Sequence, residues 1–417
     1  MKHLRLALIL LVFAPGALRA DSNPDAQDQD QQQKPPTEIP DFSNLDEYVY
    51  VPKSQASFGY RIISGVKAKF TGGATIFAPE AIPAFAGQNL NRTYHDGSVT
   101  EDTRTVITEN GDGTAFSQAI TPDGKTNNWS YTNSSQLTSD GYMQFHIYSA
   151  QVQSTEFDAS GRTNVGMEVS TTHDYKDYGK HWSLKLFGGM SINDISSASI
   201  SSVNATLTTT TDTYDLFGIT PPAVSSGTPY SSSGSSSAIE NVLDANGNQV
   251  YDSSGNPVTE TVDTAILLGS APIGNRQTTL SQVQVLNYYK VHGAYATFRG
   301  GPQLIYNFTN HFHLAVSAGP ALVYAGSTYG VTQTLTPPTG APIVEALVDT
   351  TSKLLYGYYV DATVQYDLTD TSGFYLGGYE QSTGSYNQSA TSPGGTYTTN
   401  LDFNNLGGLR GGMEVKF

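Results

Sequence analysis

One segment of the chain, Lys353–Leu368, alternates apolar and polar side chains along its whole length. Its apolar positions are Leu354, Tyr356, Tyr358, Val360, Ala362, Val364, Tyr366 and Leu368. Successive residues of a β-strand point to opposite faces, so this segment predicts a strand with one apolar and one polar face. Tyr356 and Tyr366 stand ten positions apart. At ~3.3 Å per residue and a tilt of about 40°, they are separated by roughly 25 Å, as expected for the two aromatic girdles of a membrane-spanning strand.

The same alternation recurs in seven further segments. They are Phe58–Phe70, Asn164–Tyr175, Trp182–Asn193, Tyr288–Phe308, Phe312–Tyr324, Phe374–Gln381 and Leu401–Phe417. Short links and long links alternate between them, whereas a soluble sandwich would space its strands more evenly. The pattern predicts an all-β fold, an antiparallel up-and-down transmembrane β-barrel of about eight strands. A further strand-like segment, Tyr142–Val152, lies inside the first long link and leaves ten strands as the alternative.

The last segment carries a more specific signal. Val415 and Met413 precede the terminal Phe417 at alternate positions, and charged residues stand between them. An alternating strand that ends in an aromatic residue resembles the closing strand of Gram-negative outer-membrane β-barrel proteins, here a small barrel with long extracellular loops. The resemblance implies that the protein resides in the outer membrane. It also implies that the barrel insertion machinery reads Phe417, Val415 and Met413.

The amino-terminal part of the chain differs in composition from the rest. Residues 1–20 combine basic residues, the apolar run Leu6–Phe13 and a small residue, Ala20, which predicts a cleaved secretory signal peptide. Residues 21–56 are acidic and rich in Pro and Gln, and we expect a disordered periplasmic tail. The barrel would then span 57–417, with long extracellular loops at about 71–163 and 194–287. The second loop is rich in Ser and Thr, and we expect it to be mobile.

Charged residues of both signs occupy the polar faces of the predicted strands. An eight-stranded barrel has an interior just wide enough for its own side chains, and an unpaired buried charge is costly. We therefore expect an ionic plug in the lumen, with a narrow anion-preferring pore as the alternative. The residues expected in the plug are Arg61, Lys67, Glu168, Lys185, Arg299, Asp361, Arg410 and Glu414. Those expected in the aromatic girdles are Tyr306, Tyr324, Tyr356 and Tyr366.

The formal net charge of −16 lies mostly in the long loops, which makes a nucleic-acid partner improbable on electrostatic grounds. The sequence contains no G-x-S-x-G, H-E-x-x-H or P-loop pattern. His311 and His313 are spaced as metal ligands could be, but their place beside a short turn favours ordinary rim residues. Asp244–Val258 lacks the glycine and glutamate spacing of a calcium loop and predicts a hairpin turn. We therefore expect no catalytic, cofactor or metal site.

These features favour a non-enzymatic outer-membrane barrel with a structural, adhesive or surface-interaction role. A small porin for small solutes is one alternative. A secreted, soluble carbohydrate-binding β-protein is another. The expected partners are outer-membrane lipid or lipopolysaccharide, the barrel insertion machinery, and an extracellular ligand bound by the acidic loops.

Overall fold

A computed structural model describes most of the chain from residue 52 onward. The described ranges are 52–76, 91–101, 105–109, 115–119, 124–159, 161–224, 228–233, 237–241, 243–244, 246–251, 254–263 and 266–417. All of them belong to one compact unit, Pro52–Phe417. The predicted signal peptide and nearly all of the predicted tail lie outside the described residues.

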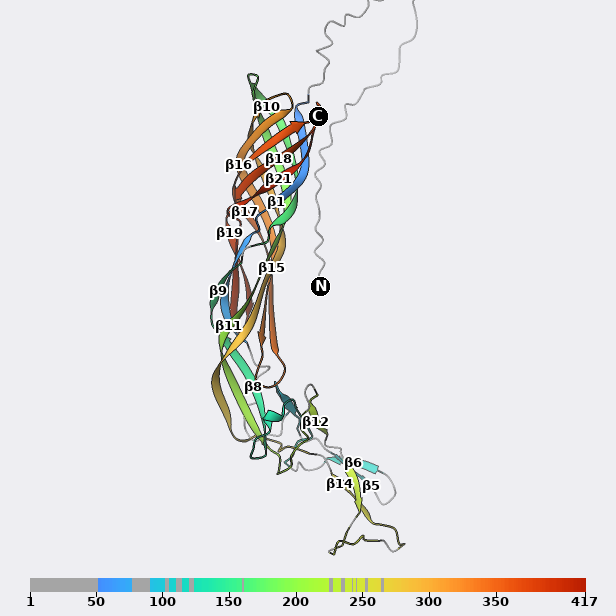
Figure 1. Ribbon diagram of the computed structural model, residues 1–417. Coiled ribbons are helices and arrows are strands. Elements are labelled where there is room, and N and C mark those ends of the chain that lie inside the picture. The colour runs from blue at the N-terminus through green and yellow to red at the C-terminus, as the bar shows by residue number, and fades with distance from the viewer. Residues whose placement is uncertain are drawn as a thin grey trace, which may run out of the picture. The chain divides into compact units, whose positions relative to one another are not determined.

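Eight antiparallel strands close into a barrel, as the alternation predicts (Figure 1). They are β1 (Ser54–Ile63), β10 (Asn164–Tyr178), β11 (Trp182–Asp215), β15 (Ile273–Asn307), β16 (Phe312–Leu335), β17 (Ile343–Asp367), β18 (Ser372–Ser382) and β21 (Leu406–Lys416). Each strand pairs with its two neighbours. The ring is completed because β1 pairs with β21 on one side and with β10 on the other, while β10 also pairs with β11. The eight-strand prediction is confirmed over the ten-strand alternative.

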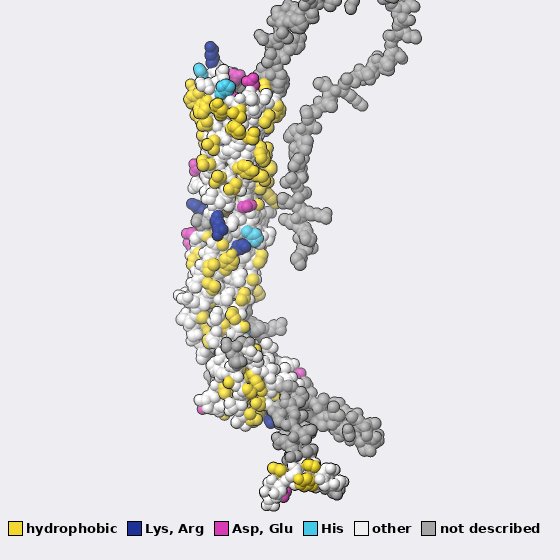
Figure 2. Space-filling view, turned by 45° about the vertical axis from the view of Figure 1, so that its right-hand side comes forward, with side chains coloured by type: hydrophobic (Ala, Val, Ile, Leu, Met, Phe, Trp, Pro, Cys, Tyr) yellow, Lys and Arg dark blue, Asp and Glu magenta, His cyan; other side chains and the backbone are white. Residues whose placement is uncertain are grey.

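Large apolar side chains cover the outside of this barrel. Tyr356 is 72% exposed and Phe58 is 54% exposed, although exposed apolar surface of this extent is unstable in water. Figure 2 shows yellow, apolar side chains covering the visible face of the barrel, and we call this apolar outer surface the belt. Tight turns connect the strands at one end of the belt, which we call the turn end, and the strands leave the belt at the extension end. Within the described residues, no helix has the length and hydropathy needed to cross a bilayer.

Four barrel strands continue far beyond the belt. β11 has 34 residues and β15 has 35, so each could span roughly 110 Å. Together with β16 and β17 they build an extension, a continuation of the same sheet with the strand order β17-β16-β15-β11-β8-β2-β20-β19. The added strands are β2 (Lys67–Ile76), β8 (Tyr142–Val152), β9 (Thr155–Ala159), which pairs with β2, β19 (Ser385–Ser392) and β20 (Gly395–Asp402).

The extension corrects one loop prediction and confirms a predicted strand. The Ser/Thr-rich segment after Asn193 is not a loop: it runs as strand to Asp215 and pairs with β15 along most of that length. The physical reason is that Thr is β-branched and favours strands. β15 pairs with most of this segment, and β8 pairs with its second half, Ala205–Asp215. The strand-like segment Tyr142–Val152 is confirmed as β8. It pairs with β11 and β2 outside the barrel ring.

The interior changes character where the barrel meets the extension. On β15, alternate residues point inward from Val285 to Ile305, but Arg299 and Thr297 in the barrel give way to Tyr295, Val291 and Tyr289 in the extension. The extension therefore encloses an apolar, aromatic core. Within it, the Phe70 ring stacks on Tyr289 and on Tyr329, at centroid distances of 5.3 and 5.8 Å.

Two predicted strands are each divided at this boundary. Phe58–Phe70 breaks after Ile63, and the chain then leaves the barrel to form β2 in the extension. Lys67 consequently lies exposed on the outer face of β2, opposite Asp402, and not in the lumen. Leu401–Phe417 divides between β20 and β21 around Asn405, whose φ is 56°.

The far end of the extension carries a small cap. Its sheet has the order β12-β7-β4-β3, and its aromatic side chains pack on β8 and on the end of β11. The cap elements are β3 (Arg92–Tyr94), β4 (Gly97–Val99), β7 (Asn128–Tyr131), the 3₁₀ turn η2 (Ser134–Gln136) and β12 (Tyr230–Ser233). Two further hairpins join β5 (Thr105–Glu109) to β6 (Ala115–Ala119) and β13 (Ser237–Asn241) to β14 (Thr259–Asp263).

The hairpin turn predicted from Asp244–Val258 is confirmed. Leu243 bridges to Gln249, and the Asp244 carboxylate accepts backbone hydrogen bonds from Asn246 and Asn248 at 2.8 and 2.9 Å. The carboxylate therefore organises its own turn.

Two valines on the same face of β17 test whether the belt lies in lipid. Val360 is in the belt and Val348 is in the extension, at 47% and 70% exposure. Val360→Arg should lower the free energy of unfolding by about 2–4 kcal/mol, because it places a cation in hydrocarbon. Val348→Arg should change it by no more than about 0.5 kcal/mol. Urea titration in lipid vesicles measures both, and equal losses would contradict the assignment of the belt.

Candidate functional site

The centre of the barrel lumen is occupied by one glutamate and three arginines. The Glu168 carboxylate lies 3.2 Å from Arg61 Nε, 2.7 Å from Arg299 Nη2 and 2.5 Å from Arg410 Nη1. All four side chains are buried. They come from β10, β1, β15 and β21, so the contacts bridge the lumen.

A second carboxylate completes this lumen cluster. Asp361 Oδ2 lies 3.5 Å from Arg299 and 3.4 Å from Arg410, and Oδ1 accepts a hydrogen bond from Ser317 at 2.7 Å. Aromatic rings cover the guanidinium groups, as where Arg61 lies 3.8 Å above the Tyr379 ring. Such stacking and pairing reduce the cost of burying charge.

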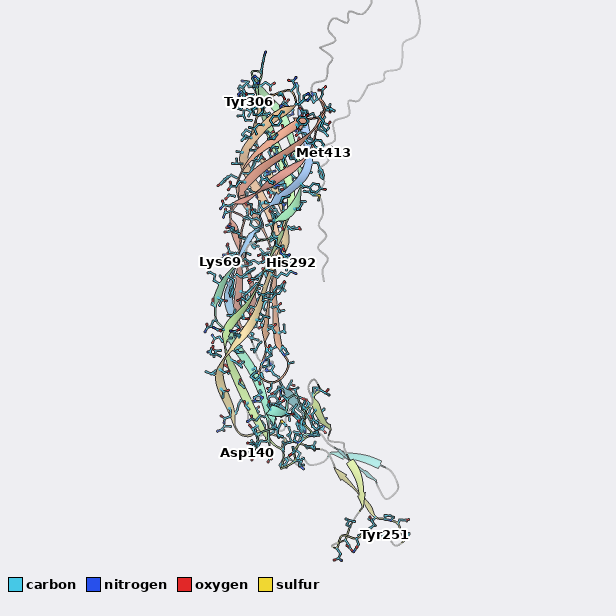
Figure 3. All side chains as sticks on the ribbon, in the orientation of Figure 1. Lys69, Asp140, Tyr251, His292, Tyr306 and Met413 are labelled. Carbon is cyan, nitrogen blue, oxygen red and sulfur yellow. The ribbon has the colours of Figure 1, made fainter. Side chains whose placement is uncertain are left out.

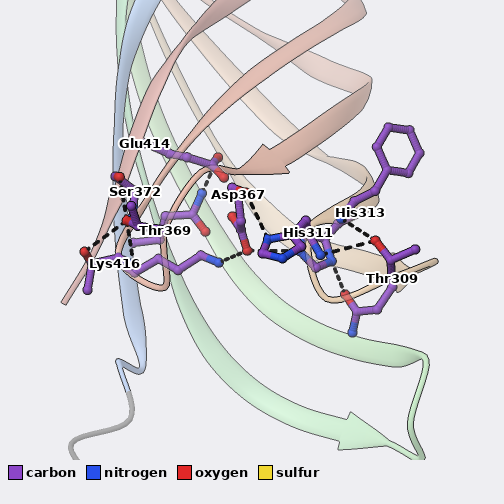
Figure 4. A network of polar contacts seen from close by, with 12 residues as sticks. Thr309, His311, His313, Asp367, Thr369, Ser372, Glu414 and Lys416 are labelled. Atoms are coloured by element: carbon purple, nitrogen blue, oxygen red, sulfur yellow. Dashed lines mark hydrogen bonds and ion pairs between the residues drawn. The ribbon is translucent and has the colours of Figure 1, made fainter.

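A separate polar network lies at the turn end of the lumen (Figure 4). Asp367 forms an ion pair with Lys416 and accepts from His313 Nε2 at 3.0 Å. Beside them, Gln55 donates to Glu414 at 2.5 Å. Predicted plug residue Lys185 also lies at this end, 2.9 Å from Asp174.

The structure therefore distributes the predicted plug residues over two layers. Arg61, Glu168, Arg299, Asp361 and Arg410 meet in the lumen cluster. Glu414 and Lys185 belong to the layer at the turn end, and Lys67 lies outside the barrel.

The two turn-end histidines serve as rim residues. His313 uses both ring nitrogens, because Nδ1 lies 2.7 Å from Asn307 Oδ1 while Nε2 contacts Asp367. His311 Nδ1 lies 3.1 Å from the Asp367 carbonyl. Among the residues that the structure describes, no group of three or more potential ligands could hold a metal ion.

The predicted girdle and insertion residues lie on the outer surface. Tyr306 packs against Trp182 at a centroid distance of 4.8 Å near the turn end, and Tyr366 pairs with Phe312 there. Tyr324 and Tyr356 lie near the opposite edge of the belt. Figure 3 labels Tyr306 and the insertion residue Met413 on the barrel. The other two insertion residues, Val415 and Phe417, also face outward, and the backbone of Phe417 pairs with Ser54.

A third polar cluster, which the sequence did not reveal, fastens the cap to the extension. Thr339, in the β16–β17 connection, donates to Asp96 Oδ2 at 2.7 Å and contacts the Tyr148 hydroxyl at 2.5 Å. Asp96 also lies 2.6 Å from His146 Nδ1. Gly340 has φ +87°, and a Cβ there would lie 2.4 Å from the His95 carbonyl, so the loop requires glycine for this close approach.

This cap cluster contains a hydroxyl, an imidazole and a carboxylate, but its geometry is not that of a catalytic triad. In a triad the hydroxyl and the carboxylate bind different ring nitrogens of the histidine. Here Asp96 and Thr339 both approach Nδ1 of His146, at 2.6 and 3.5 Å. The cluster is therefore arranged to hold the loop, since the hydroxyl donates to the carboxylate itself.

No model of a known protein family matches this sequence, and no curated protein matches it. Solved structures with low similarity to it include three outer-membrane proteins. The outer membrane protease OmpT from Escherichia coli is 9% identical, with a TM-score of 0.25, covering 88% of this chain and 97% of that chain. A Pseudomonas aeruginosa FadL homologue is 10% identical, with a TM-score of 0.17, covering 88% and 90%. The outer-membrane expressed OmpT of Vibrio cholerae is 7% identical, with a TM-score of 0.11, covering 88% and 99%. Such scores carry no inference about activity.

Removal of the central carboxylate should unfold the lumen cluster. Glu168→Gln removes the carboxylate paired with three buried arginines and leaves Asp361 paired with Arg299 and Arg410. We expect a loss of about 3–5 kcal/mol in the free energy of unfolding. Glu156→Gln removes an exposed partner of Lys69 and should cost no more than about 1 kcal/mol. Thermal unfolding in detergent compares the two, and similar losses would contradict a structural role for Glu168.

The cap should loosen in acid. Burial lowers the pKa of His95, with partial opposition from Asp96, and His95 Nδ1 accepts a hydrogen bond from Tyr148 N at 2.9 Å. The unfolded chain binds this proton near pH 6.5, so the contribution of His95 to stability is complete above that pH and is lost as the pH falls toward its folded pKa. The protection factors of the β8 amides, in which the intrinsic pH dependence of hydrogen exchange is divided out, should therefore fall between pH 7 and 5. His95→Gln, whose amide oxygen can accept the same bond, should remove the change.

Proposed function

We propose that the protein is an integral outer-membrane β-barrel with a closed lumen, whose role is to carry the extension and cap outward for surface interaction. The observation that supports this most is the filling of the lumen, because the Glu168 cluster bridges the barrel. The aromatic core of the extension lies directly beyond it. A non-enzymatic role accords with the holding geometry of the cap cluster.

The alternatives fit the observations less well. A small porin needs a continuous polar path, whereas the inward side chains Tyr295 and Phe403 pack edge to face at 5.3 Å beyond the lumen cluster. A secreted soluble protein would expose the whole apolar belt to water. We also propose that the barrel insertion machinery recognises Phe417 together with Val415 and Met413.

The cap offers a specific candidate for contact with other surfaces. Phe217 is 51% exposed and has φ 53°, a conformation that bulky side chains rarely adopt. Asp215 holds the turn by accepting from Phe217 N at 2.7 Å, and Ile219 nearby is 44% exposed. A strained turn that displays an aromatic ring costs stability, so we propose that this ring contacts a partner.

Replacement of that ring should separate binding from folding. Phe217→Asn suits the left-handed conformation, so the free energy of unfolding should stay within about 1 kcal/mol of the parent. Adherence of expressing cells to one another and to protein- or glycan-coated glass should fall. Ile200→Thr removes an exposed apolar side chain from the flank of the extension and should leave adherence unchanged. Unchanged adherence of Phe217→Asn on every surface would contradict this role.

Electrical recording tests the closed lumen. The unmodified protein in planar bilayers should show no stable single-channel current, because ion-paired side chains bridge its lumen. Stable, ohmic channels would contradict the closed lumen and favour the porin.

A further inference from the structure

The outer surface of the extension contains a polar hollow of about 390 Å³, within the range of roughly 300–1,000 Å³ that small-molecule sites occupy. It lies on β2 and reaches the two strands that pair with β2 there, β9 and β20. Figure 3 labels one of its residues, Lys69, between Met413 on the barrel and Asp140 near the far end. The lining residues are Lys67, Ala68, Lys69, Asp158, Ala159, Asn400 and Asp402.

The strand register brings the polar lining residues to one face of the sheet. Asp402 lies opposite Lys67, and Asn400 lies opposite Lys69. On the other side of β2, Asp158 also lies opposite Lys69. Directly opposed residues share a face, and so do residues two apart on one strand. Since Lys67 is exposed, this shared face is the outer one.

Some polar groups of the hollow are already paired within the protein, and others are not. Lys69 forms an ion pair with Glu156 at 2.5 Å. In contrast, no ion pair or side-chain hydrogen bond between described residues involves Lys67 or Asp158. The hollow therefore presents an ammonium group that can donate hydrogen bonds beside a carboxylate that can accept them.

The mixture of charges limits what the hollow can bind. Two lysines and two aspartates line it, so an anion would meet carboxylates and a cation would meet ammonium groups. An apolar molecule would take water away from these charged groups without replacing its hydrogen bonds. A sugar suits the mixture, because each hydroxyl group can donate to a carboxylate and accept from an ammonium group.

The polar surface continues from the hollow along β20 and β19. Asn400 donates to Asn387 Oδ1 at 2.7 Å, and the hydroxyls of Ser389 and Thr398 lie 3.0 Å apart two residues farther from the barrel. These side chains lie on the same outer face as the hollow, because they occupy alternate positions of the paired strands. Hydrogen-bonding groups therefore follow one another along the sheet, as a chain of several sugars requires.

We propose that this hollow binds a neutral glycan. Lys67 donates to one sugar hydroxyl, and the Asp158 carboxylate accepts from a neighbouring hydroxyl. Asn400 and Asp402 complete the polar wall on the β20 side. The inference deepens the proposed surface role and rests on it for the source of the glycan, since an extension that faces outward meets glycans outside the cell. Binding to the purified protein tests the site without that assumption.

The test measures binding of fluorescently labelled oligosaccharides of glucose, galactose and mannose to the full chain, folded in a detergent without sugar headgroups. Combined Lys67→Ala and Asp158→Ala should weaken binding by at least about tenfold, because each lost hydrogen bond to a charged group lowers affinity roughly tenfold or more. A matched control, Asp177→Ala with Lys180→Ala, removes the same two groups from the exposed β10–β11 turn. The control should bind like the parent.

Two further arms separate the sources of the glycan and test its class. Oligosaccharide released from the cells' own lipopolysaccharide is compared with the neutral oligosaccharides, and the tighter binder identifies the source. Complete displacement of the bound sugar by betaine, a zwitterion, would overturn the choice of a glycan. Equal binding by the double variant and the parent, or binding of none of the sugars, would overturn the site. Heat-modifiable gel migration reports barrel folding separately, so failure of this site is distinguishable from failure of the proposed outer-membrane barrel.

Discussion

The structure depends on one constraint: the same strands pass through two different surroundings. Alternate residues of each strand face inward. Which side chains are stable on the two faces depends on whether the outer face meets lipid or water. In the barrel, outward residues such as Phe298 are apolar and inward residues such as Arg299 are charged. In the extension, outward Lys290 is charged and inward Tyr289 is aromatic. The reversal takes place along single, unbroken strands, so one ladder of hydrogen bonds supports both halves.

The lumen cluster follows from that constraint. The interior of an eight-stranded barrel is too narrow to hold charged side chains together with hydrating water. Charged side chains that face inward must therefore pair with one another across the lumen. Glu168 satisfies this for three arginines at once, and the rings of Tyr379 and Phe187 also cover the guanidinium groups of Arg61 and Arg299. Burial of these charges costs desolvation free energy, and separation of the ion pairs would leave buried charges unpaired. The network therefore accords with the proposed role of the barrel as a closed anchor.

The extension continues the barrel strands and supports the cap at its far end. Its aromatic core stiffens the long strands, and the Thr339–Asp96 contact ties a hairpin that originates in the barrel to the cap. The cap is thereby held on β8 and β11 as well as by its own sheet. For the proposed contact of Phe217 with a partner, a firmly held cap would lower the conformational entropy lost on binding.

The sequence by itself determined the eight segments that form the barrel, because alternation of period two is a local property that each segment carries alone. The alternation of short and long links predicted the antiparallel order of these segments. The strand-like pattern of Tyr142–Val152 predicted β8 with the same first and last residues that the structure shows. The sequence could not place Lys67, because alternation continues unchanged through Phe58–Phe70 while the chain moves from the barrel into the extension. Nor could it bring together Asp96, His146 and Thr339, which stand far apart along the chain. Only the closed sheet decided how the strands of the extension pair and whether each face meets lipid, water or other side chains. The reason is that these contacts join residues far apart in the sequence, which local patterns do not connect.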